Sequence, residues 1–276
     1  MDWRHLPGPW RNMTTVQWRE PVQSHGARIA VYSCYFGRHE PFHPDALGPE
    51  GEWDRIVFTD HPDLVVAGAQ VVQVVDPSIA AAGLSRLPKI RPHLFLAGYD
   101  WLIYVDNRAR LRCDPAGLIG RIEAEYPQGA PAGRYLFRHG ERDCAYRETR
   151  VCRRMGSITK AQAHGIKRQF QAAGFPENQG LFVNTCMIQK TGSTSTDQAN
   201  DLWFSLFMTM APRDQITLPF VLWQLGTAFE VLPMTRSDVV DWPVFGFRDR
   251  RRFRLGLPPV PKAVAEQVDE TDETSA

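Results

Sequence analysis

Aspartates follow two apolar runs of this sequence. Asp106 closes residues 101–105 (WLIYV) and Asp60 closes residues 55–59 (RIVFT). A carboxylate at the end of a buried parallel strand is well placed to hold a divalent cation, which can bridge the oxygens of a diphosphate. An aspartate there also commonly starts a turn. Both interpretations stay open for Asp106. For Asp60, the two alternatives are a contact with the ribose or base of a nucleotide and the start of a turn.

Basic side chains gather just before the apolar run at residues 101–105. Arg86, Lys89, Arg91 and His93 fall within eight residues, in the segment SRLPKIRPHLF. Pro92 suits the first turn of a short helix, whose N-terminus would add backbone N–H donors for an anion. A phosphate site is favoured over a solvated basic face.

Three further segments carry side chains that could do chemistry. His139, Arg142 and Asp143 lie in RHGERD, where the histidine is either a titrating group or a structural one. Asp214 in RDQ precedes an apolar helix and could cap it. Five arginines and one aspartate occupy residues 248–254, as a diphosphate clamp or a solvated surface. Nucleic acid is not expected as a partner, because no pattern of base-stacking aromatics accompanies them.

Alternating elements must position these groups. Strands are expected at residues 28–36, 55–59, 71–75, 101–105, 134–137, 180–189 and 228–232. Ser157 is expected to cap a helix over residues 158–173, and Thr196 is expected to cap a second helix. A third helix contains Pro219 and ends at Gly226. It either begins near Leu218 or kinks there. This alternation predicts an α/β fold with a mostly parallel mixed sheet flanked by helices, whose ligands bind beyond the carboxyl ends of the strands.

Composition sets the domain organisation. The chain has 276 residues, 43% hydrophobic and 23% charged, with a net charge of +1 that combines a +5 body with a −4 tail. We expect an N-terminal arm over 1–26, a single domain over 27–256 and a disordered acidic tail over 257–276. Five cysteines without a C-x-x-C pair favour a reducing, cytoplasmic location. Trp3, Trp10 and Trp18 cap a core edge or, as an alternative, contact the inner face of a membrane.

Several segments recur in the order found in a known family. IAVYSCYFGRHE, RIVFTD, KIRPHLFLAGYDWLIYVDN, RHGERDCAYRE, GFPENQGLFVNT and RDQITLPFVLWQLG together resemble the glycosyltransferase-like domain of plant turgor-regulation-defect and mucilage-related proteins and of bacterial polysaccharide-locus proteins. The match covers residues 28–225. The resemblance implies a GT-A-like fold, a nucleoside-diphosphate sugar as donor, and a glycan or lipid-linked acceptor, in surface polysaccharide synthesis.

The resemblance also implies roles for individual residues. Asp106 would hold the diphosphate or a Mn²⁺ or Mg²⁺ ion, and Asp214 would be the base of an inverting reaction or position the sugar in a retaining one. The expected donor contacts are Asp60, Arg86, Lys89, Asn107, Arg142 and Asp143, with His139 as a further catalytic candidate. The expected sugar and acceptor contacts are Glu177, Asn178, Asn184, Arg213 and Gln215.

One departure from the family pattern leaves alternatives open. GT-A enzymes commonly carry two acids as D-x-D, whereas Asn107 and Arg108 follow Asp106 here, and Arg108 could replace part of a metal's charge. A non-catalytic nucleotide-sugar-binding protein is therefore a second hypothesis. A third is an amidohydrolase of the ceramidase type, because a plant relative is described as one; His139 with Asp143 is the nearest approach to its ligand set.

Overall fold

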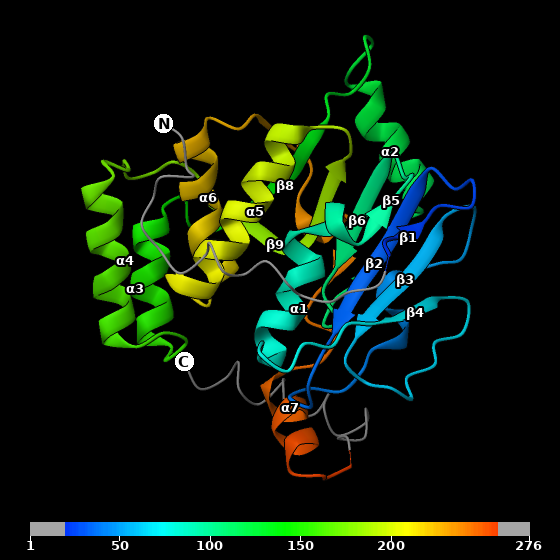
Figure 1. The fold of residues 1–276 in the computed structure, drawn as a ribbon, viewed down its shortest axis with the longest axis horizontal. Helices are drawn as coiled ribbons and strands as arrows, with labels where there is room; N and C mark the ends of the chain where they lie inside the picture. The colour runs from blue at the N-terminus through cyan, green and yellow to red at the C-terminus, as the bar shows by residue number, and fades with distance from the viewer. Residues whose placement is uncertain (1–19, 259–276) are drawn as a thin grey trace, which may run out of the picture.

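The computed structural model describes residues 20–258, and their centre is one twisted sheet (Figure 1). Within this range the sheet has seven strands in the order β10-β8-β9-β6-β2-β3-β4. Their bounds are β10 Phe229–Val231, β8 Gly133–Arg138, β9 Phe182–Lys190, β6 Trp101–Val105, β2 Ile29–Tyr35, β3 Asp54–Thr59 and β4 Gln70–Gln73.

The sheet is mixed because of a single strand. β9 runs antiparallel to both β6 and β8, whereas the pairs β2–β3, β2–β6, β3–β4 and β10–β8 are parallel. The carboxyl ends of β2, β3 and β6 therefore meet at one edge, together with the beginning of β9. The predicted α/β fold with a mostly parallel mixed sheet and flanking helices is confirmed.

Helices cover both faces of the sheet. α1 (Ala81–Ile90), α5 (Thr194–Thr209) and α6 (Asp214–Leu225) bury one core with the strand side chains, including Leu87, Trp203 and Val221. α2 (Pro115–Ala124) closes the other face through Leu118, Ile119 and Ile122. A small antiparallel pair, β7 (Arg110–Leu111) with β11 (Val240–Asp241), lies on that second side.

Two helices form a separate layer on α6. In α4 (Lys160–Ala172), Phe170 packs against Phe220 of α6, and α3 (Ala145–Arg154) joins the same core through Tyr146 and Cys152. Figure 1 shows them at the far side of α5 and α6 from the sheet. α7 (Phe247–Arg254) lies apart from these layers, at the bottom of the same view.

Two expected helix starts are wrong by a few residues. α4 begins after Thr159, not Ser157, because the Thr159 hydroxyl and the Gln162 side chain form a reciprocal capping box. α5 begins after Ser193, whose hydroxyl accepts from the backbone N–H of Thr196, the residue expected to be the cap.

For the third helix, the alternative of a start near Leu218 is wrong. α6 runs from Asp214, with Pro219 inside it, and ends at Gly226 in the left-handed conformation. Arg213 occupies the N-cap position, so Asp214 is the first helical residue. Its carboxylate still accepts from the backbone N–H of Gln215 at 2.9 Å.

The proposed arm and tail are only partly covered by the structure. Val22–Gln23, as β1, pair with β5 (Leu96–Ala97), so this part of the expected arm is bound to the body. Residues 1–19 of the arm, including its three tryptophans, lie outside the described residues, as does the tail from residue 259. Between residues 20 and 258 no helix is long and apolar enough to cross a bilayer.

Candidate active site

Two strand ends and one helix start bring the site together. Asp106 directly follows β6, and its backbone N–H donates to the carbonyl of Thr185 in β9 at 2.8 Å. Asp214 stands at the start of α6, which packs across β9. The two aspartates, 108 positions apart in sequence, thereby come to the same end of the sheet.

A buried lysine joins these two acids. Lys89, on the last turn of α1, is 2% exposed, and its Nζ lies 3.2 Å from Oδ1 of Asp106 and 2.8 Å from Oδ2 of Asp214. Arg86, one helical turn earlier, places its Nε 3.4 Å from the same Oδ2 of Asp214. Lys89, Arg86, Asp106 and Asp214 form what we call the four-charge cluster. It pairs two cations with two carboxylates.

The charges of the cluster stabilise one another. Burial alone would raise the pKa of Asp214, but Lys89 and Arg86 outweigh it and hold that pKa well below its usual range. Burial likewise acts against the charge of Arg86, and the neighbouring carboxylate of Asp214 raises its pKa above the ordinary value. Both groups are therefore charged at neutral pH.

Part of the four-charge cluster is accessible to solvent. The side chains of Asp106 and Arg86 are 28% and 32% exposed, whereas Lys89 is almost fully enclosed. A ligand can therefore contact Asp106 and Arg86 directly and interact electrostatically with the buried ammonium group of Lys89. A fixed cation in such a partly desolvated place acts more strongly on an anion than one in bulk water.

Tyr104 is a site residue that the sequence reasoning missed. Its hydroxyl donates to Oδ1 of Asp106 at 2.6 Å, and Nζ of Lys89 lies 4.8 Å from its ring centre. Burial raises the pKa of Tyr104 well above its ordinary value, so the hydroxyl stays protonated and acts as a donor. The available signal was its spacing: residues two apart on a strand face the same side.

Burial also raises the pKa of the Cys34 thiol, which leaves no thiolate here.

Asp60 holds the loop after β2. Both of its carboxylate oxygens accept from the backbone N–H of Gly37, at 2.9 and 3.1 Å, and Nε2 of His61 lies 2.7 Å from the Gly37 carbonyl. The imidazole of His61 stacks on Tyr35. Gly37 itself has φ +68°, a conformation that favours glycine.

Asn107 and Arg108 turn away from the four-charge cluster. The Asn107 amide donates to Glu40 and to the Pro41 carbonyl, and its oxygen accepts from the His43 N–H at 2.8 Å. Arg108 donates to the Phe245 carbonyl at 3.2 Å. Both side chains thus fix loops beside Asp106.

This donor set does not fit a divalent cation held by protein side chains. Oδ1 of Asp106 already receives the Tyr104 hydroxyl and the Lys89 ammonium, and the oxygen of Asn107 is occupied by His43. Across residues 20–258, no three His, Cys, Asp or Glu side chains gather where they could hold a metal ion. The cations that the site does offer are Lys89 and Arg86.

The RHGERD segment forms a second polar group, after β8. Nδ1 of His139 accepts from the backbone N–H groups of Glu141 and Arg142, and Arg142 donates to the buried Glu148 at 2.7 Å. Burial and the charge of Arg142 lower the pKa of His139 below its ordinary value. Asp143 instead faces Arg147, at 3.7 Å. His139 and Asp143 thus have different partners, which gives no support to the amidohydrolase hypothesis.

Asn184 has the unusual feature of a buried amide without partners. The residue is 6% exposed, yet neither its amide nitrogen nor its oxygen has a hydrogen-bond partner within residues 20–258. It precedes Thr185 on β9, whose carbonyl receives the Asp106 N–H. Such a group costs roughly 1–3 kcal/mol unless a ligand satisfies it.

The remaining expected contacts lie around the start of α6. Gln215 donates to the Phe182 carbonyl at 3.0 Å and ties α6 to β9. Arg213 precedes the helix. Glu177 and Asn178 are exposed in the loop before β9, where Asn178 has φ +60°. The structure places them on the β9 and α6 side of the site.

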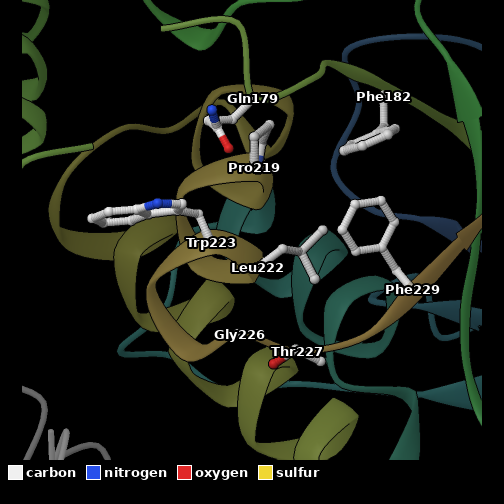
Figure 2. A pocket seen from close by; sticks show the side chains of 8 residues that line it. All are labelled: Gln179, Phe182, Pro219, Leu222, Trp223, Gly226, Thr227 and Phe229. Atoms are coloured by element: carbon white, nitrogen blue, oxygen red, sulfur yellow. The ribbon is translucent and has the colours of Figure 1, made fainter. Parts of the chain in front are cut away.

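A cavity of about 350 Å³ lies along α6 on this side (Figure 2). Its walls are the α6 residues Pro219, Leu222 and Trp223, the rings of Phe182 and Phe229, and the Gln179 side chain, with Gly226 and Thr227 at one end. Figure 2 shows the two phenylalanines facing Leu222, and Gln179 above Pro219. Aromatic walls with an amide at the rim suit the apolar face and hydroxyls of a sugar ring or an acceptor's apolar group.

Comparison with solved structures gives distant matches. No protein-family model and no curated protein matches the chain. Solved structures that it resembles include the bifunctional glycosyltransferase WbbM (9% identity, TM-score 0.45, 83% of this chain) and mouse xyloside xylosyltransferase 1 (11%, 0.41, 76% of this chain and 85% of that one). The chain spans only 44% of the WbbM chain. Identities and TM-scores this low leave the function to be argued from the chain's own site.

Proposed function

We propose that this protein is a glycosyltransferase that moves a sugar from a nucleoside-diphosphate donor to a glycan or lipid-linked acceptor. The observation that carries the proposal is the four-charge cluster at the carboxyl end of the sheet, where α/β proteins bind their ligands. The sequence resemblance to the glycosyltransferase-like family supports the same reaction, and its segments contain three of the four members of the cluster, Lys89, Asp106 and Asp214.

Lys89 and Arg86 would stabilise the leaving group. In the reaction the bond between the sugar C1 and the diphosphate oxygen breaks and the acceptor oxygen bonds to C1. Negative charge grows on the departing diphosphate, which takes up the proton that the acceptor hydroxyl loses. Fixed cations aimed at that charge lower the barrier, because they need no reorganisation during the reaction. Arg86 is exposed enough to form a bidentate contact with phosphate oxygens, and Lys89 adds a buried positive charge behind it.

Asp214 suits a positioning role better than that of a base. A general base works best with a pKa near the operating pH. The pKa of Asp214 lies well below its usual range because two cations pair with its carboxylate. In our proposal Asp214 therefore holds Lys89 and Arg86 in place, and Asp106, held by Tyr104, contacts the donor sugar or its diphosphate.

The acceptor would lie on the β9 and α6 side. The unpartnered amide of Asn184 offers both a donor and an acceptor to sugar hydroxyls. The cavity along α6, which Phe182 of β9 also lines, would take the remainder of the acceptor. Asp60, through the loop at Gly37, shapes the opposite wall toward the nucleotide.

Incubation with a panel of nucleotide sugars, with and without Mn²⁺, tests the proposal. We expect release of nucleoside diphosphate from at least one donor, increased by an oligosaccharide or lipid-linked acceptor. Tight donor binding without turnover would instead support a non-catalytic nucleotide-sugar-binding protein. Cleavage of ceramide without any nucleotide binding would refute the transferase and support the amidohydrolase.

A further inference from the structure

Exposed apolar side chains concentrate at the end of the described chain. Among residues 20–258, nine large apolar side chains are exposed, and five of them are Trp242, Phe247, Phe253, Leu255 and Leu257. Phe247 and Leu255 are 65% and 62% exposed. Single exposed apolar residues are ordinary, but a local group of them marks an interaction surface.

The helix at the centre of this group has no core of its own. α7 has eight residues, Phe247–Arg254, and none of them is buried. Its cap is internal: Asp249, its only acid, accepts from the backbone N–H of Gly246 at 2.8 Å. A helix this short is only marginally stable without packing. We therefore expect another surface to pack against α7 and stabilise it.

The same helix is strongly cationic. Its eight residues include five arginines, of which Arg248, Arg251 and Arg254 are exposed. Arg252 and Arg254 donate to the backbone carbonyls of Pro258 and Arg250. These hydrogen bonds use the guanidinium groups without neutralising their charge. The surface offers positive charge beside aromatic rings, which is the combination that an anionic lipid interface attracts.

α7 is attached directly beside the candidate active site. The Val244 N–H donates to the Arg108 carbonyl at 2.9 Å, and the Arg108 guanidinium lies against the rings of Trp242 and Phe245. Arg108 is two residues after Asp106. In Figure 1 α7 stands clear of the sheet and its flanking helices, where a flat surface could reach it.

We infer that α7 with its flanks, residues 242–257, docks on an anionic lipid bilayer, with its arginines at the head groups and its apolar side chains in the interface. The chain's own acidic tail is the rival occupant. Its last ten residues (QVDETDETSA) could match the charge but carry one large apolar side chain, Val268, against five exposed ones. This inference is independent of the proposed function, because it concerns lipid binding alone.

Co-sedimentation of the full chain with vesicles tests the inference. Vesicles of phosphatidylcholine alone should leave the protein in solution, and an equal mixture with phosphatidylglycerol should bind it, less so at high salt. Replacing two arginines (Arg251→Ala with Arg254→Ala) should weaken binding about 30-fold, since each basic group near such a surface contributes about 1 kcal/mol. Phe247→Ser with Phe253→Ser should also weaken it.

Matched controls separate this surface from general charge. Arg153→Ala with Arg154→Ala removes the same charge from the exposed end of α3 and should leave binding unchanged. Equal binding by the α7 variant and the unmodified chain would overturn the inference. So would binding that appears only after Asp269→Asn, Glu270→Gln, Asp272→Asn and Glu273→Gln, which would make the tail the occupant of α7. Failure of the unmodified chain to bind anionic vesicles would overturn it as well.

Discussion

The ammonium nitrogen of Lys89 lies 2.8 Å from Oδ2 of Asp214, inside a protein where Lys89 is 2% exposed. The same nitrogen is 3.2 Å from Oδ1 of Asp106. One buried cation thus joins an acid at the end of β6 to an acid at the start of α6. The stability and the proposed chemistry of the site both depend on this lysine.

Removing the lysine charge should destabilise the protein and stop donor turnover. Lys89→Met leaves two carboxylates facing each other without this buried cation, which should lower the free energy of unfolding by about 3–5 kcal/mol. Urea unfolding measures this effect. Lys160→Met, at the exposed start of α4, is the matched control and should change stability by less than about 0.5 kcal/mol. Equal stability of the two variants would contradict the pairing.

The pH dependence of stability should reveal Asp214. Because its pKa is lower in the folded than in the unfolded protein, its stabilising contribution is complete above the ordinary carboxyl pKa of about 3.9 and is lost as the pH falls below it. Asp214→Asn should therefore flatten the acid side of the stability curve, measured by urea unfolding at a series of pH values. Asp143→Asn, at an exposed site, controls for the loss of one negative charge. Identical acid slopes in Asp214→Asn and the unmodified protein would rule out this linkage.

Asn184 should separate stability from activity. Asn184→Leu replaces a buried amide that has no partner within the described chain, so the free energy of unfolding should stay equal or rise by about 1 kcal/mol. If the amide binds a sugar, the same variant should lose at least tenfold in kcat/KM. Thermal unfolding and transfer assays on one preparation measure both. A large loss of stability would show that Asn184 is structural.

A buried arginine outside the site should matter for stability alone. Arg134 donates twice to Oδ1 of Asn200, at 2.9 and 2.6 Å, and burial lowers its pKa to about 10. Asn200→Leu removes the acceptor and should cost about 3 kcal/mol. Gln198→Leu, exposed on the same helix, should be close to neutral in urea unfolding. Similar stabilities for the two variants would argue against this network.

The sequence was sufficient for the seven strands of the central sheet. Buried parallel strands are near-continuous apolar runs, so the run at residues 101–105 coincided with β6. Helix starts were less certain because Ser157 and Thr159, or Ser193 and Thr196, are all acceptable caps by residue type. The choice depends on which hydroxyl meets a backbone N–H three residues later.

The interior of the site was harder to predict. Arg86, Lys89 and Asp106 were expected near one another, but the position of Lys89 between Asp106 and Asp214 depends on how α1 packs against α5 and how α6 crosses β9. Asn107 was expected at the donor, and its contacts with His43 and Glu40 come from a loop more than 60 residues away in sequence. Such long-range contacts leave no local pattern.

Nucleoside diphosphate release measures whether Asp106 works with Lys89 and Arg86 in sugar transfer. With the best donor of the panel, the unmodified protein should release nucleoside diphosphate, and Asp106→Ala should lower the rate at least about 100-fold while circular dichroism shows a retained fold. Asp106→Asn, which keeps the shape of the side chain, should be equally impaired. Full donor turnover in either folded variant would contradict the account.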